Sequence, residues 1–229
     1  MGWKMRFYII TPERAFPLAE WSEKMSYRTT IRCVSNPGHQ RAGDRQDILR
    51  INVLSTKYID VIWTWYSELL FSEKIVEMFR KENITGYVVS TVVVDNVFSS
   101  AERQNLLLIN KKPCVVSEKY DNNNQNIIEK LSEIKIIGKG GFADKHTGIL
   151  LLEQCNECGY KKYTPFRNGI FIDEKQWDGS DMFRVEPFGY AVVSERFKMV
   201  VEKNKILNIC FRETKDIIHP SRRNIGKNT

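Results

Sequence analysis

The fold follows from the stretch Ser72-Glu73-Lys74-Ile75-Val76-Glu77-Met78-Phe79-Arg80-Lys81, which is the best-defined helical signal in the chain. Its apolar residues recur at the spacing that places them on one face of a helix. Ser72 suits the N-cap position because its hydroxyl can accept a hydrogen bond from the first turn, and Glu73 complements the positive helix end. We therefore predict a short amphipathic helix that ends near Asn83 and Gly86. The valine-rich run from Tyr87 to Val94 is predicted to follow it as a strand.

A second stretch, Ala191-Val192-Val193-Ser194-Glu195-Arg196, repeats this pattern. When Ser194 is aligned with Ser72, the apolar positions of the two helices coincide, and each helix is followed by a strand-like run. Segments 66–94 and 188–213 are therefore consistent with two related strand-helix-strand modules. The alternative is that Ser-Glu-Lys is a common helix opening and that two ordinary helices match by chance. In both cases each helix has one apolar stripe to bury, so we expect it to pack on a sheet.

The expected fold class is α+β, with a mixed or antiparallel sheet and short amphipathic helices packed on it. The 229 residues, of which 42% are hydrophobic, can bury a sizeable core without a disulfide or a metal. The low numbers of proline and glycine argue against extensive disorder. We therefore expect residues 1–229 to form a single domain.

Residues 1–10 make a poor signal peptide because their basic side chains are scattered among the apolar ones. No later stretch approaches the roughly 18 uninterrupted apolar residues that a membrane helix needs. Five cysteines, an odd number, indicate a reducing compartment. We therefore expect a cytoplasmic protein that does not engage a membrane.

The sharpest local motif is the CxxCG turn Cys155-Asn156-Glu157-Cys158-Gly159, within segment 153–165. Two thiolates at this spacing can reach one metal ion, and the glycine lets the backbone turn beneath it. Zinc takes four such ligands, and the upstream candidates are Cys33 and His39, which lie on either side of the turn Asn36-Pro37-Gly38. Together the four side chains would make one structural zinc site with no open position. The alternative is that the two motif cysteines are reduced thiols in a turn that binds no metal.

The sequence contains no convincing set of catalytic residues. The nucleophile motif G-x-S-x-G does not occur, and Gly138-Lys139-Gly140-Gly141 has the composition of a phosphate loop without its spacing. Cys114 and Cys210 lie within apolar runs, so we expect them to be small buried hydrophobic residues. We therefore expect a protein that is not an enzyme and that acts by binding.

Several short motifs between Cys155 and Glu213 form a set. They are the CxxCG turn, Ile172-Asp173, Met182-Phe183-Arg184-Val185, Val192-Val193-Ser194-Glu195-Arg196-Phe197 and Phe211-Arg212-Glu213. Together with segment 66–89, they resemble the double-CxxCG-motif immunity proteins, a family that accompanies bacterial toxins of the swarming-inhibition type. The resemblance implies a non-enzymatic inhibitor that binds and neutralises its cognate toxin in the cytoplasm of the producing cell or its kin.

The chain departs from the family pattern at the first of the two CxxCG motifs. Cys33 matches the first cysteine, but Asn36 stands where the second cysteine belongs and Pro37 where the glycine belongs. Either the zinc site is lost or His39 takes the fourth position. The function that the resemblance implies would survive without the metal, since an immunity protein must above all keep the face that meets its toxin.

The net charge of +7 fits an acidic protein partner and also fits nucleic acid. If the partner is a toxin, the charge predicts an acidic face on it. This favours a toxin other than a nuclease, because the active face of a nuclease is basic. The alternative function is that of a zinc-knuckle nucleic-acid-binding protein, with Lys161, Lys162 and Arg167 as the basic residues beside the CxxCG turn.

Overall fold

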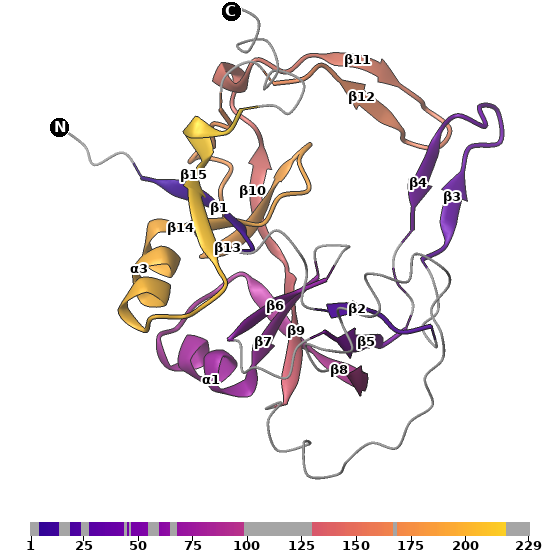
Figure 1. The fold of residues 1–229 in the computed structure, drawn as a ribbon. Coiled ribbons are helices and arrows are strands. Elements are labelled where there is room, and N and C mark those ends of the chain that lie inside the picture. The colour runs from indigo at the N-terminus through magenta and orange to yellow at the C-terminus, as the bar shows by residue number, and fades with distance from the viewer. Residues whose placement is uncertain are drawn as a thin grey trace, which may run out of the picture.

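The structure is a computed structural model that describes residues 5–13, 19–23, 28–43, 45, 47–54, 60–64, 68–98, 130–166 and 169–218. This part of the chain forms a five-stranded sheet, a six-stranded sheet, two separate hairpins and two α-helices (Figure 1). The mixed and antiparallel sheets with packed helices are compatible with the predicted α+β class, but the protein is richer in strand than we expected. Neither of the described α-helices is long and apolar enough to cross a membrane.

The five-stranded sheet has the strand order β10-β13-β14-β1-β15. Its strands are β1 (Phe7–Thr11), β10 (Gly138–Phe142), β13 (Met182–Glu186), β14 (Val192–Ser194) and β15 (Cys210–Glu213). Neighbouring strands are antiparallel except β10 and β13, which are parallel. Strand β1 lies between β14 and β15, so segments from opposite ends of the described chain build one sheet.

The six-stranded sheet has the strand order β2-β5-β8-β9-β7-β6. Its strands are β2 (Ala19–Trp21), β5 (Leu49–Val53), β6 (Val61–Trp63), β7 (Leu69–Ser72), β8 (Tyr87–Val97) and β9 (Leu131–Ile136). Strand β8 contains the valine runs predicted as a strand, and it pairs with two neighbouring strands. Residues 87–91 pair antiparallel with β9, whereas residues 92–97 pair parallel with β5. This long strand therefore joins the two halves of the sheet.

The helices α1 (Glu73–Lys81) and α3 (Glu195–Lys203) have the same length, and each lies between two strands in the chain. Each begins directly after a strand that ends in serine, and each is followed by a further strand. The turns that leave the helices also match, because Asn83 and Lys205 both adopt positive φ, at 53° and 52°. In both segments the residue that follows donates its backbone N–H to a carbonyl of the helix. The two segments thus share their local structure.

The two serines differ in how they cap the helices. Ser194 accepts a hydrogen bond from the backbone N–H of Phe197, at 3.2 Å. Ser72 has the extended backbone of an N-cap residue, but its hydroxyl makes no capping hydrogen bond, so the predicted side-chain cap is wrong there. Ser72 is buried as the last residue of β7, where it pairs with Leu131 and donates its N–H to the carbonyl of Asp60. Strand pairing therefore fixes the start of α1.

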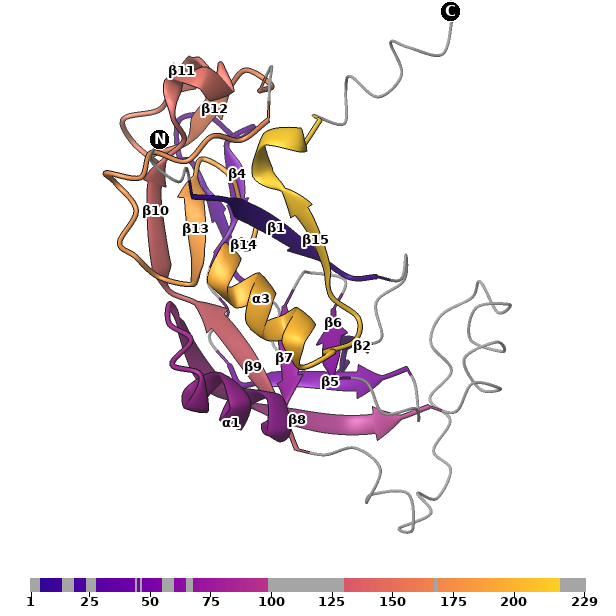
Figure 2. The same ribbon diagram turned by 90° about the vertical axis from the view of Figure 1, so that its left-hand side faces the viewer.

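One hydrophobic cluster joins the two sheets through the helices. Phe79 of α1 and Phe197 of α3 are fully buried with ring centroids 5.2 Å apart, and the two helices lie side by side (Figures 1 and 2). The cluster extends into both sheets through Val61, Leu69, Phe71, Ile134, Tyr8, Ile10, Met182 and Val193. Alternate residues of the same strands point to the opposite faces, where two smaller clusters form. Each sheet therefore carries buried apolar side chains on both of its faces.

The chain passes from one sheet to the other between β9 and β10, which are separated only by Ile137. A Cβ atom on Gly138 would lie 2.2 Å from the carbonyl oxygen of Met182, and one on Gly86 would lie 2.0 Å from the same oxygen. The backbone N–H groups of Ile137 and Gly138 both donate to the carbonyl of Gly86. The two glycines thus allow three backbone segments to meet where the sheets join.

We predict that Gly138→Ala destabilises the protein by about 1–3 kcal/mol, because the added methyl group forces the β9–β10 crossing away from β13. Thermal and urea unfolding would measure the change. Gly189→Ala is the matched control, since a Cβ atom there meets nothing within 4 Å. Equal stability of the two variants would contradict the tight packing at the crossing.

Candidate metal centre

The hairpin of β3 (Thr30–Arg32) and β4 (Gln40–Ala42) presents Cys33 and His39 at its tip. The backbone N–H of Cys33 donates to the carbonyl of His39 at 3.2 Å, so the two residues lie across from each other at the end of the hairpin. Asn36 closes the turn by accepting the N–H of Gly38 on its side-chain oxygen, at 2.9 Å. The turn predicted from Asn36-Pro37-Gly38 therefore brings two candidate ligands together.

The hairpin of β11 (Leu151–Gln154) and β12 (Lys161–Tyr163) carries the CxxCG motif in its turn. The backbone N–H of Cys155 donates to the carbonyl of Tyr160 at 2.8 Å, and that of Gly159 donates to the carbonyl of Cys155 at 2.9 Å. Gly159 has a φ of 69°, a left-handed conformation that glycine adopts without steric cost. The glycine of the motif thus lets the chain turn beneath the two thiols.

Ion pairs to buried carboxylates fix the base of the β3–β4 hairpin on the six-stranded sheet. Arg28 precedes β3 and Arg45 follows β4, and both contact the carboxylate of Glu68, at 3.1 and 3.6 Å. Arg45 also pairs with Glu133 of β9. The side chains of Arg45, Glu68 and Glu133 are at most 6% exposed, so each of these charges depends on its partners. The hairpin therefore leaves the sheet in a defined direction.

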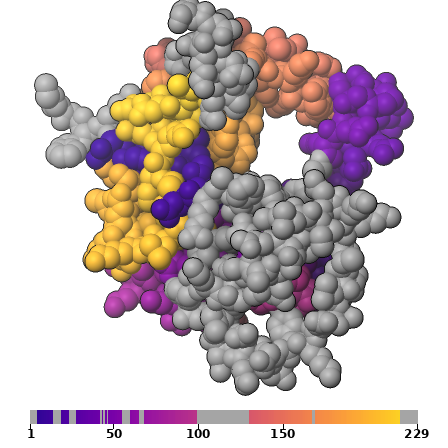
Figure 3. All heavy atoms as spheres, viewed as in Figure 1, coloured from indigo at the N-terminus to yellow at the C-terminus, as the bar shows by residue number. Residues whose placement is uncertain are grey.

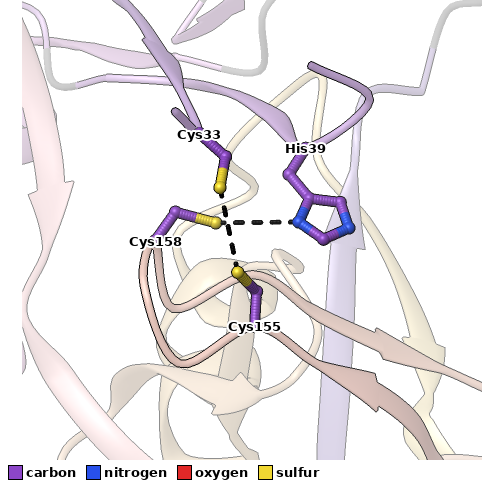
Figure 4. A group of neighbouring side chains, drawn as sticks. All are labelled: Cys33, His39, Cys155 and Cys158. Atoms are coloured by element: carbon purple, nitrogen blue, oxygen red, sulfur yellow. Dashed lines mark hydrogen bonds between the residues drawn. The ribbon is translucent and has the colours of Figure 1, made fainter. Parts of the chain in front are cut away.

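The tips of the two hairpins meet at Cys33, His39, Cys155 and Cys158 (Figure 4). One potential ligand atom from each residue lies within 4.8 Å of the other three. The Sγ atoms of Cys33 and Cys155 are 3.8 Å apart, and Cys158 Sγ lies 3.9 Å from His39 Nδ1. A tetrahedral site with metal–sulfur bonds of about 2.3 Å places its ligand atoms about 3.8 Å apart. The cluster could therefore hold one metal ion with all four positions filled by protein.

His39 is oriented by the opposite hairpin. Its Nε2 lies 2.7 Å from Glu153 Oε1, and its ring stacks on Tyr160 with centroids 4.3 Å apart. When the Nε2 proton is shared with this carboxylate, Nδ1 presents its lone pair to the sulfur atoms, which is the tautomer of a metal ligand. Glu153 and Tyr160 thus support the site, although the sequence reasoning missed them. Their only sequence signal is that each lies two residues outside the CxxC pair.

Hydrogen bonds to the sulfur atoms alter the acidity of the thiols. The backbone N–H groups of Cys158 and Glu157, followed by His39, lower the pKa of Cys155 to about 6. The hydroxyl of Ser35 lowers the pKa of Cys33, whereas burial raises that of Cys158. Cys155 and then Glu153 raise the pKa of His39 by hydrogen bonding. Because a metal binds the thiolate form, Cys155 is the ligand that is most readily available at neutral pH.

The four residues predicted as ligands lie together in the structure, and Asn36 does not join them. The side-chain nitrogen of Asn36 lies 3.0 Å from His39 Nε2 instead, on the ring atom that does not face the sulfur atoms. The four side chains therefore have the arrangement of a possible metal site, and the alternative of reduced thiols that bind no metal stays open.

The remaining predicted positions are distributed differently. Cys210 is exposed on β15, so its predicted burial is wrong. Its neighbours Ile209 and Phe211 pack against the core, and strand alternation turns Cys210 outward. Cys114 and Arg167 lie outside the described residues. Lys161 and Lys162 are exposed on β12, directly after the CxxCG turn.

We predict that iodoacetamide alkylates Cys155 several-fold faster than Cys158 in the metal-free protein at pH 7. With a pKa of about 6, roughly 90% of Cys155 is thiolate at that pH, which outweighs the lower nucleophilicity of a more acidic thiol. The rate at Cys155 should fall as the pH drops through 6, because protonation removes the thiolate.

Peptide mass spectrometry would follow each cysteine separately in this experiment. Added zinc should protect Cys33, Cys155 and Cys158 but leave the exposed Cys210 reactive. Equal rates at Cys155 and Cys158, or no protection by zinc, would contradict the arrangement of the cluster.

No model of a known protein family matches this chain, and no curated protein matches it. The resemblance to the double-CxxCG-motif immunity proteins therefore rests on the motifs in the sequence, and a function must be inferred from the geometry of the site.

Proposed function

We propose that this protein is an immunity protein that binds and neutralises a cognate bacterial toxin in the cytoplasm, without catalysis. The observation that carries the proposal is the closed cluster of Cys33, His39, Cys155 and Cys158, which joins the tips of two exposed hairpins. A site whose four positions are all filled by protein offers no position for a substrate, and such sites serve structure. A metal in this site would hold the two hairpins in one fixed arrangement. A fixed surface suits a protein that acts by binding a partner.

The positions of the family-like motifs support the same function. Met182 to Val185 form most of β13, Val192 to Phe197 form β14 and the start of α3, and Phe211 to Glu213 form most of β15. Most of their apolar side chains are buried in the two clusters that flank the five-stranded sheet. The motifs that resemble the immunity proteins therefore belong to the core of the five-stranded sheet. Surface residues that meet a particular toxin would be expected to differ from one pair to another.

We also propose that the metal is zinc. Three thiolates and one imidazole are the ligands of a common class of structural zinc sites, and zinc accepts the tetrahedral arrangement that the hairpin tips provide. A bound ion would link residues more than a hundred positions apart in the chain, and would therefore fix the two hairpins to each other.

Elemental analysis of the purified protein should find one zinc per chain. Cys158→Ser is expected to reduce the zinc content severely, because it removes one of four ligands. Cys210→Ser should keep the full content, since this exposed cysteine lies outside the cluster. A wild-type protein without zinc after purification in zinc-containing buffer would overturn the metal assignment.

The immunity function is tested by co-expression with the toxin-like product of the neighbouring gene. We expect the two proteins to co-purify as a stoichiometric complex and the chain to restore growth. The alternative function, nucleic-acid binding, is favoured by one observation: Arg32, Arg41, Lys161 and Lys162 are all exposed on the two hairpins. Absence of complex and rescue, combined with retention on DNA or RNA that weakens steeply with salt, would establish that alternative instead.

A further inference from the structure

We propose that the toxin binds across the two joined hairpins, through an aliphatic and basic surface that complements an acidic, apolar face on the toxin. This inference rests on the proposed immunity function. The surface, called here the hairpin surface, consists of Val34, Arg41, Leu150, Leu151, Leu152 and Lys161.

Aliphatic side chains are concentrated on these hairpins and face solvent. Val34 is 91% exposed, and Leu150, Leu151 and Leu152 are 60%, 49% and 59% exposed. These three leucines are consecutive in the chain, and the pairing of β11 with β12 shifts register between Leu151 and Glu153, which interrupts the regular alternation of side chains. Single exposed leucines are ordinary, but several exposed aliphatic side chains on two hairpins whose tips meet indicate an interaction site.

The charges on the two hairpins leave the hairpin surface positive. The acidic residues Glu153 and Glu157 both point to the opposite hairpin, where they contact His39 and Ser35. By contrast, none of the exposed cations Arg32, Arg41, Lys161 and Lys162 forms an ion pair with a residue that the structure describes. A partner that neutralises these cations and covers the leucines must present carboxylates around an apolar contact.

A protein fits this surface better than nucleic acid does. Phosphates could pair with the cations, but they would leave the leucines and Val34 exposed to water. Bases bind by stacking on aromatic rings, and the nearby Tyr160 and Tyr163 already contact His39 and Phe142. The aliphatic character of the surface therefore selects a protein partner.

The cluster of potential ligands makes one surface out of two hairpins. Figure 3 shows the two hairpins meeting at a distance from the main body in this view, so little core supports them. A two-stranded hairpin is marginally stable by itself, and its ordering would otherwise reduce the affinity for a partner. A metal that joins the tips would order the hairpins in the free protein, so toxin binding would not have to supply the free energy of ordering them. Chelation of the metal should therefore weaken toxin binding.

The test measures the Kd between the zinc-loaded chain and the candidate toxin, the product of the neighbouring gene, by isothermal titration calorimetry. Leu152→Glu should raise the Kd at least about tenfold, because it places a charge in the apolar contact. Met199→Glu is the matched control: Met199 is 57% exposed on α3, away from the hairpins, and should leave the Kd unchanged. Unchanged zinc content and melting temperature would show that both variants are folded.

A second pair of variants tests the charge. Lys161→Glu should raise the Kd several-fold and make binding less sensitive to salt, whereas Lys74→Glu on α1 should do neither. Lys161 is preferred to Lys162 because Lys162 lies opposite Glu153, which supports the cluster. If the wild type binds and neither hairpin variant weakens binding, this inference is wrong while the immunity function stands. If the wild type neither binds nor rescues growth, both proposals fall.

Discussion

The packing of Phe79 against Phe197 is the contact on which the rest of the structure depends. Each helix covers the sheet of its own segment, and the contact between the helices merges the two cores into one. Buried Asp181 strengthens the same junction, since its carboxylate accepts hydrogen bonds from Thr85 beyond α1 and from Ser194 before α3. The relative position of the two sheets is therefore fixed in the interior, by burial of apolar surface and by a satisfied buried charge.

The fixed position of the sheets allows the hairpins to meet. One hairpin is anchored to the six-stranded sheet by arginines that pair with buried carboxylates, and the other follows β10 of the five-stranded sheet. Neither hairpin has a hydrophobic core of its own, and β11 is exposed along its whole length. A metal at the shared tip would supply the stability that burial cannot supply there. With a metal bound, the protein would have two kinds of cross-link, an apolar one inside and a polar one at the surface.

The sequence by itself determined the local features of this protein. Apolar periodicity and the serines before each helix placed α1 and α3, and the matching turns at Asn83 and Lys205 follow from the same local pattern. The four candidate ligands could also be named, because cysteine and histidine have few chemical roles and the CxxCG spacing forms a turn within one short segment. These features depend on interactions between residues that are neighbours in the chain. They can therefore be predicted from the sequence without knowledge of the tertiary structure.

Only the tertiary structure decided how the strands pair and which side chains support the site. The division of β8 between β5 and β9, and the insertion of β1 between β14 and β15, bring together segments that are distant in the chain. The exposure of Cys210 depends on which face its strand turns to the core. The contacts of Glu153 and Tyr160 with His39 depend on two hairpins from different sheets. Non-local pairing is set by the burial of the whole core, and no local pattern in the sequence contains that information.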